Sequence, residues 1–285
     1  MPAFLRQKKN LYIFIGILLI AAVAAAAFFV LTSEKGSGTE ENQTSNSSQK
    51  ESSNSTSNTT TADVTWQWDS EKWSSNGTAP TCSTPLLTDL PVNINKITTI
   101  LYPGQERGGD FKPHGGFRLG TDNNISVSVP LDASVTEGSR YIESGEVQNM
   151  FTFINSCGIA YRFDHLHTLS EKFQKLAEQL PEAKVDDSRT TPFNPPIKVV
   201  KGDIVATKVG FVNTQNVSVD FGVYDLRNTN EASKNTSFAQ SYENEKQFAF
   251  YGICWLKEYS SEISQKLLAF PGGDSVNGKT SDYCK

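Results

Sequence analysis

The chain has 285 residues, of which 37% are apolar, and its formal net charge at pH 7 is −5. This length allows one folded domain of about 200 residues once polar tails are set aside. The mild negative charge, without a basic stripe or patch, excludes nucleic acid as an expected partner.

An apolar segment without a single charge occupies residues 11–31. It is long enough to cross a bilayer as a helix, and the basic residues before it favour a cytoplasmic N-terminus. A cleaved signal peptide usually has a shorter apolar core, of about 7–15 residues. We therefore predict a cytoplasmic N-terminus at 1–10, an uncleaved transmembrane anchor at 11–32 and a single-pass membrane protein whose main domain is extracytoplasmic.

A Ser/Thr/Asn-rich segment with almost no apolar side chains follows at residues 33–62. Such a composition predicts a disordered linker that holds the domain off the membrane. The chain contains eight N-x-Ser/Thr triplets, which begin at Asn42, Asn46, Asn54, Asn58, Asn76, Asn124, Asn216 and Asn235. Composition alone produces many such triplets, and they are glycosylation targets only in a host that modifies asparagine outside the membrane.

All four cysteines lie on the predicted outer side, where disulfides persist. None forms a C-x-x-C pair, so a zinc knuckle is not indicated. Four cysteines allow three connectivities. We favour Cys254–Cys284, which would tie the last segment back onto the domain, together with Cys82–Cys157.

The residues after the linker are predicted to be mostly strands, because β-branched and aromatic runs alternate with Gly, Pro, Asn and Asp. These runs are residues 97–102, 125–131, 147–155, 158–163, 196–200, 203–211 and 217–226. The pattern predicts a mainly β domain at 63–230.

Two helical regions interrupt or follow the strands. A capping-box spacing between Thr168 and Glu171 predicts a helix over 169–180, which Pro181 ends. A second helical stretch is expected between residues 244 and 270, broken near Ser260. The domain should therefore carry one inserted helix and a helical C-terminal segment at 231–285.

Five segments in the β region stand in an order that resembles a known family. They are HGGFR (114–118), VPLDASVTEG (129–138), GIAYRFDHL (158–166), VVKGDIVATKVG (199–210) and VSVDFGVYD (217–225). Their order is similar to that of the lysostaphin-type, or LytM-type, zinc endopeptidases. The resemblance covers about residues 97–227. It implies a compact antiparallel β-sandwich of the duplicated-hybrid-motif type.

The resemblance also assigns the metal positions. The first zinc ligand matches His114 and the assisting histidine matches His165, but the aspartate ligand is replaced by Arg118. The closing His-x-His strand reads Ser218-Val219-Asp220. Arginine stays protonated and cannot ligate a cation, and a catalytic zinc normally needs three protein ligands. No cofactor is therefore favoured, and the former site is expected to be lined by His114, Arg118, His165, Ser218 and Asp220.

Strand alternation suggests what occupies that site. Side chains two apart on a strand face the same way, so Ser218 and Asp220 should face the former site while residues 217, 219, 221 and 223 pack on the other face. Arginine and carboxylate groups pair bidentately. We therefore predict an Arg118–Asp220 ion pair in place of the metal.

The alternative is a zinc site with rearranged ligands. His165 and His167 would share a face if their strand continued, and with His114 they would form a three-histidine site, to which Asp122 could add a ligand. In that case the chain would be an active zinc endopeptidase that cleaves envelope peptides, with His165 catalytic. A helix start at Thr168 would instead leave His167 on the surface, which is the interpretation we favour.

Other candidate sites have ordinary structural explanations. The tryptophans of TWQWDSEKW (65–73) could stack on sugars, but a first strand packed on the domain is favoured. Asp186 and Asp187 could form a carboxylate pair, but a solvated loop is favoured. No serine lies in a nucleophile-elbow sequence.

The favoured function is a membrane-anchored LytM-like pseudoenzyme that acts as a binding or regulatory module and recognises an envelope peptide or protein. Tyr161, Tyr224 and Arg162 are expected near its groove, where aromatic and arginine side chains commonly anchor ligands. The rival interpretation makes both tyrosines core or edge-strand residues and places the helix at 169–180 over the groove.

Overall fold

The computed structural model describes residues 64–285. The predicted cytoplasmic segment at 1–10, the anchor at 11–32 and the linker at 33–62 lie outside the described residues. Within residues 64–285, none of the helices has both the length and the apolar character required to span a membrane.

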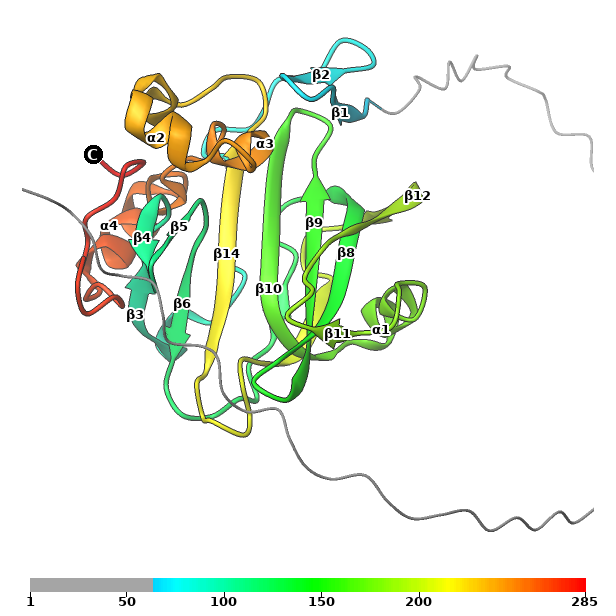
Figure 1. Cartoon of the computed structure of the whole chain (residues 1–285), viewed down its shortest axis with the longest axis vertical. Helices are drawn as coiled ribbons and strands as arrows, with labels where there is room; N and C mark the ends of the chain where they lie inside the picture. Colours follow the sequence, from blue (N-terminus) through cyan, green and yellow to red (C-terminus); the bar gives the residue numbers. More distant parts are fainter. Residues whose placement is uncertain (1–63) are drawn as a thin grey trace, which may run out of the picture. The chain divides into compact units, whose positions relative to one another are not determined.

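A ten-stranded sheet forms most of the described structure (Figure 1). Its strands are β3 (Ile97–Leu101), β6 (Gly115–Leu119), β7 (Val127–Ser128), β8 (Ala133–Glu143), β9 (Glu146–Ile154), β10 (Ile159–Leu169), β11 (Lys184–Val185), β12 (Thr191–Val199), β13 (Ile204–Val209) and β14 (Ser218–Asp225). The main path is β11-β8-β9-β10-β14-β6-β3; β12 pairs with β8, and β13 pairs with both β10 and β7. All of these pairs are antiparallel except β11–β8. The prediction of a mainly β protein is confirmed.

Two hairpins and several short helices complete the described structure. The hairpins are β1 (Trp66–Trp68) with β2 (Trp73–Ser75), and β4 (Gln105–Arg107) with β5 (Asp110–Lys112). The α-helices are α1 (Glu171–Ala177), α2 (Thr236–Ser241), α3 (Lys246–Ala249) and α4 (Ser261–Ala269). Three 3-10 helices are η1 (Ile94–Lys96), η2 (Glu231–Lys234) and η3 (Trp255–Lys257). The expected helical character of the C-terminal segment is confirmed, including the break at Ser260, which caps α4.

The inserted helix begins later than its sequence pattern predicts. Thr168 still belongs to β10, where it pairs with Lys208 of β13 and is held in extended backbone. The N-cap of α1 is Ser170, whose side chain makes no capping hydrogen bond. The predicted capping box is therefore wrong, because the β10–β13 ladder extends through Thr168.

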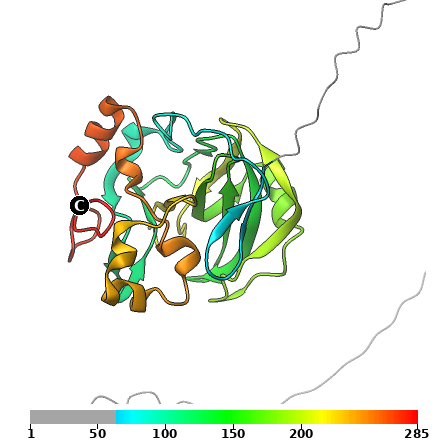
Figure 2. The same cartoon turned by 90° about the horizontal axis from the view of Figure 1, so that it is seen from above.

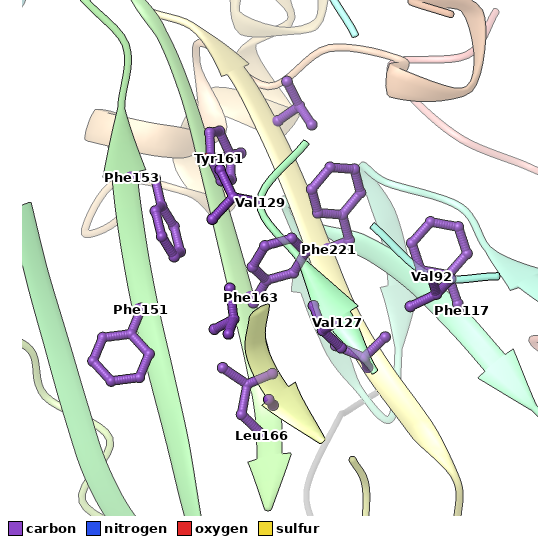
Figure 3. Packing of buried hydrophobic residues seen from close by; sticks show 14 of the residues in the cluster. Val92, Phe117, Val127, Val129, Phe151, Phe153, Tyr161, Phe163, Leu166 and Phe221 are labelled. Carbon is purple, nitrogen blue, oxygen red and sulfur yellow. The ribbon is translucent and has the colours of Figure 1, made fainter. Parts of the chain in front are cut away.

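Aromatic side chains from neighbouring strands form the core on one face of the sheet (Figure 3). Phe163 of β10 lies with its ring centroid 5.1 Å from that of Phe221 of β14 and 5.8 Å from that of Phe153 of β9. Strands β7 and β13 and helix α1 cover this face; the α1 residue Phe173 contacts Phe153, with 6.0 Å between ring centroids. Residues 217, 219, 221 and 223 are all buried here, as the alternation predicts. The opposite face of the same strands is thereby left for polar side chains.

Both predicted disulfides are present, Cys82–Cys157 and Cys254–Cys284. The segment after β14 gathers on one side of the domain, near β3 and β6 (Figure 2). Its Trp255 inserts against Phe117, with 5.0 Å between ring centroids. The C-terminal segment at 231–285 thus shares the core of the β domain, and the described residues belong to one compact unit.

The tryptophan hairpin packs on the domain, as favoured above. Trp68 lies edge-on to Tyr251, with ring centroids 6.0 Å apart, and Trp73 lies 6.0 Å from Phe248. The Trp73 indole N–H donates to the carbonyl of Gln247 at 2.6 Å. These rings are engaged with the C-terminal segment, which explains their positions without a sugar ligand.

Candidate functional site

A polar cleft of about 1120 Å³ lies on the face of β6, β14, β10 and β8 that is opposite the core. Its walls also include the β4–β5 hairpin and residues of the C-terminal segment near α2 and α3, which Figure 1 shows at one end of β14. His114, Arg118, His165, Ser218 and Asp220 all line it. No residue of α1 does, because that helix packs on the core face. The structure thus brings the five predicted residues together in an open groove.

Strand register and two glycines place Asp220 beside His114. Asp220 of β14 pairs with Gly116 of β6, and His114 directly precedes that strand. A side chain at Gly116 would come within 3.0 Å of the Asp220 carboxylate, and one at Gly222 within 3.0 Å of the His114 Cβ. With both positions free of side chains, His114 Nε2 lies 2.9 Å from Asp220 Oδ2.

The hydrogen bonds of His114 determine its tautomer. Its Nδ1 lies 2.8 Å from Nη2 of Arg162. A guanidinium can only donate, so Nδ1 accepts and the ring proton resides on Nε2, which donates to Asp220. Burial lowers the pKa of His114 and the nearby Arg162 and Arg107 lower it further, against the opposing attraction of Asp220. His114 is therefore a neutral imidazole with both nitrogens engaged.

Asp220 carries the negative charge at the centre of the cleft. Burial alone would raise the pKa of its carboxyl, but the hydrogen bond from His114, together with the attraction of His165 and Arg107, holds it well below the usual range. The carboxylate is thus ionised at neutral pH.

His165 stands at an irregular point of β10. Its φ is +59°, in the left-handed region, and the β9–β10 register shifts between Phe163 and Leu166. Its Nε2 lies 3.6 Å from Asp220 Oδ2, and its Nδ1 lies 3.4 Å from the Tyr141 hydroxyl. Burial lowers the pKa of His165, but the surrounding carboxylates, Asp164 first, outweigh burial and raise it. The pKa values of the two histidines beside Asp220 are thus shifted in opposite directions.

The predicted Arg118–Asp220 ion pair is wrong. Arg118 pairs with Ser218 in the strand register, and its Nη1 donates to Asn216 Oδ1 at 3.2 Å. Within residues 64–285 no carboxylate lies within 4.0 Å of its guanidinium. Asp220 is engaged by His114 instead, because Gly222 and Gly116 give the imidazole access that the sequence pattern alone does not reveal.

Of the three histidines in the zinc alternative, His114 and His165 line the cleft and His167 does not. The left-handed backbone at His165 turns the chain between the two histidines, and His167 Nε2 lies 3.2 Å from Glu146 Oε2, outside the cleft lining. Asp122 accepts hydrogen bonds from Asn124 in an exposed loop. In the part of the chain that the structure describes, no group of three or more His, Cys, Asp or Glu side chains has an arrangement suited to a metal ion.

Only one of the three expected groove anchors lines the cleft. Arg162 does, but Tyr161 is buried in the core and donates its hydroxyl to the Leu131 carbonyl at 2.8 Å. Tyr224 is buried beneath Phe248, with ring centroids 4.8 Å apart. The expectation that both tyrosines line the groove is therefore wrong, because strand alternation sends Tyr161 inward and the C-terminal segment covers Tyr224.

Several lining residues were not predicted from sequence. Tyr141 donates to Asp164 Oδ1 at 2.6 Å, and both line the cleft. Asp164 could have been found from its i+2 spacing to Arg162, whereas Arg107 and Tyr242 belong to elements that no residue pattern indicated. The Asp186–Asp187 segment is an exposed loop, as favoured, in which Asp187 pairs with Arg189.

Comparisons of the chain with models of protein families, with curated proteins and with solved structures found no match. A function is therefore inferred from the cleft itself. Its central features are a neutral histidine fixed between an arginine and an aspartate, and a second histidine whose pKa the surrounding carboxylates raise.

Proposed function

We propose that the chain is a membrane-anchored envelope protein whose domain, of the duplicated-hybrid-motif type and related to the LytM-type zinc endopeptidases, binds an envelope peptide or protein without cutting it. The observation that carries this proposal is the double engagement of His114 by Arg162 and Asp220. In this arrangement the imidazole has no free lone pair for a metal.

The remaining groups do not supply a hydrolytic centre either. Arg118 stands where the resemblance places a carboxylate ligand, and it cannot ligate a cation. The surrounding carboxylates raise the pKa of His165, which favours hydrogen-bond donation over action as a base. Asp220 is ionised, but its carboxylate is already engaged by His114 at 2.9 Å and lies 3.6 Å from His165, so it is not free to activate a water molecule.

The cleft nevertheless has the properties of a binding site. Its volume of about 1120 Å³ slightly exceeds the range common for ligand pockets, roughly 300–1,000 Å³, and strands of the sheet form its floor. The Arg118 Nε is buried and has no hydrogen-bond partner within residues 64–285. A polar ligand seated in the cleft would satisfy that donor.

Two measurements on the full-length chain in detergent test the proposal. Metal analysis of the wild type and of a His114→Ala variant should find no stoichiometric zinc in either protein. Peptide fragments of the host envelope should be captured and recovered uncut. Stoichiometric zinc that is lost in His114→Ala, together with peptide cleavage, would establish the active zinc endopeptidase instead.

A charge-reversing substitution at Arg118 tests whether the cleft is the surface that binds the peptide. Arg118→Glu should weaken capture by about tenfold or more, the effect expected when a charged hydrogen-bond donor is replaced. Lys266→Glu is the matched control, because Lys266 lies on α4 outside the cleft lining. Unchanged capture by a folded Arg118→Glu variant would show that the cleft is not the binding surface.

A further inference from the structure

One half of the cleft is built by parts of the chain outside the segments that carry the LytM resemblance. Tyr242, Glu245 and Phe248 form this wall and face Arg107 and Phe111 of the β4–β5 hairpin across the lining. The Tyr242 ring lies 5.3 Å from Phe111 and 4.5 Å from Phe238, measured between centroids. These contacts hold Tyr242 in place at the edge of the cleft.

Two largely buried guanidinium groups in this half have no carboxylate partner. Arg107 donates to the carbonyls of Tyr102 at 2.8 Å and His114 at 3.1 Å. Arg162 contacts His114 Nδ1 and lies 6.0 Å from the centroid of the Phe248 ring. Within residues 64–285 neither has a carboxylate oxygen within 4.0 Å.

Buried charges in proteins are normally paired, and an unpaired one is costly. Burial lowers the pKa of Arg107, and the attraction of the more distant Asp220 and Asp274 does not compensate for it. The positive charge of Arg107 is thus incompletely balanced by the chain itself, whereas Tyr224, Asp164 and Asp220 outweigh burial and raise the pKa of Arg162.

The Tyr242 hydroxyl adds an unused donor to the same region. Tyr242 is 2% exposed, and its hydroxyl has no hydrogen-bond partner in the described part of the chain. Buried tyrosine hydroxyls usually find a partner. Burial also raises the pKa of Tyr242, so the group keeps its proton and can donate it. Within residues 64–285, this half of the cleft thus holds two guanidinium groups without a carboxylate partner and one hydroxyl without an acceptor.

We propose that Arg107, Arg162 and Tyr242 form a carboxylate subsite that receives the free C-terminal carboxylate of a peptide bound in the cleft. The inference rests on the proposed function and names its ligand chemistry. A monoanion fits better than a dianion, because Asp220 and Glu245 already bring negative charge to the same cleft. The forked N–H groups of a guanidinium also match the two oxygens of a carboxylate.

The test compares two forms of one probe peptide. Acetyl-Ala-Ala-Ala with a free C-terminus and the same peptide as a C-terminal amide are titrated by calorimetry into the full-length chain in detergent. The acid should bind at least about tenfold more tightly than the amide, as expected for a charge-assisted hydrogen-bond pair. Equal affinity of acid and amide would overturn the subsite.

Tyr242→Phe removes the unpaired hydroxyl without removing a contact within the described protein. It should weaken binding of the acid by about three- to tenfold, leave binding of the amide unchanged and leave the unfolding midpoint unchanged. Tyr259→Phe is the matched control, since Tyr259 also carries a buried, unpartnered hydroxyl but does not line the cleft. Equal effects of the two substitutions on acid binding would contradict the role of Tyr242.

The outcomes separate this inference from the proposed function. If the acid and the amide bind the wild type equally and neither binds Arg118→Glu, the subsite is overturned and the cleft remains a peptide site. Selective binding of the acid without capture of envelope peptides would support the subsite and overturn the proposed function. Displacement of the acid by equimolar inorganic phosphate would overturn the carboxylate assignment in favour of a phosphate ligand, and absence of binding by either peptide would overturn the subsite.

Discussion

The two faces of β10 and β14 differ completely in chemistry, although alternate residues of the same strands supply them. Tyr161 and Phe163 of β10 point into an aromatic core, whereas Arg162 and Asp164 point into the cleft. The core face is held by burial, and the cleft face by charges that compensate one another. Substitutions on the two faces should therefore differ in kind: core changes should affect stability at every pH, and cleft changes should depend on charge.

The largest effect is expected on the core face. Phe163→Ala removes a fully buried ring that contacts Phe153, Tyr161 and Phe221. It should lower the free energy of unfolding by about 3–5 kcal/mol, measured by guanidinium denaturation with the disulfides intact. Val147→Ala, at a position that is 42% exposed on β9, is the control and should cost less than about 1 kcal/mol.

On the cleft face, Asp220→Asn should cost about 3 kcal/mol at pH 7, because it removes the carboxylate that most strongly attracts Arg107 and that accepts the His114 hydrogen bond. The folded-state pKa of Asp220 is lowered, so its contribution is present above the unfolded value near 4 and is lost as pH falls toward the folded value. The difference between wild type and variant should therefore shrink below about pH 4. A difference that is constant from pH 7 to pH 3 would contradict the charge argument.

A smaller effect is expected from Tyr141→Phe. The Tyr141 hydroxyl donates to the Asp164 carboxylate at 2.6 Å, and its loss should cost about 1–2 kcal/mol in unfolding free energy. Tyr242→Phe, which removes a hydroxyl without a partner in the described protein, should cost almost nothing by the same measurement. Similar costs for the two substitutions would show that the 2.6 Å bond adds no net stability.

The smallest effects are expected from the two histidines. The contribution of each to the free energy of unfolding should change with pH by less than about 1.4 kcal/mol per pH unit. His165 has a raised pKa, so its contribution is full below its unfolded value near 6.5 and is lost as pH rises through the folded value. His114 has a lowered pKa, so its contribution is present above that unfolded value and is lost as pH falls. The cost of His165→Gln should thus decrease with rising pH, and the cost of His114→Gln should increase. Slopes of the same sign would contradict the assigned protonation states.

Local patterns predicted the features that depend on neighbours in the chain. The alternation of β14 indicated which of its side chains are buried and which face the cleft, and the runs of β-branched and aromatic residues indicated a mainly β protein. The 11-residue strand β8 was not among the predicted strands, because Gly138 and its many polar residues weaken the pattern. Its extended form depends on pairing with β9 and β12 along its length.

Contacts between segments that are distant in the chain were predicted less well from the sequence. The sequence suggested that His114, Arg118, His165, Ser218 and Asp220 would meet, and they do line one cleft. The sequence analysis paired Asp220 with the wrong partner. In the assembled sheet, Arg118 lies opposite Ser218 and Asp220 lies opposite Gly116, and this register cannot be read from either strand alone.

By itself, the sequence predicted a β-rich domain with two disulfides, and its resemblance to the LytM-type family placed Arg118 where that family has a cation ligand. Only the tertiary structure decided that His114 lies between Arg162 and Asp220, and that Arg107 and Tyr242 join the same cleft. The physical reason is that residue type and periodicity determine which face a side chain takes. Hydrogen-bond partners, protonation and the space left by Gly116 and Gly222 arise only when strands far apart in the chain are packed together.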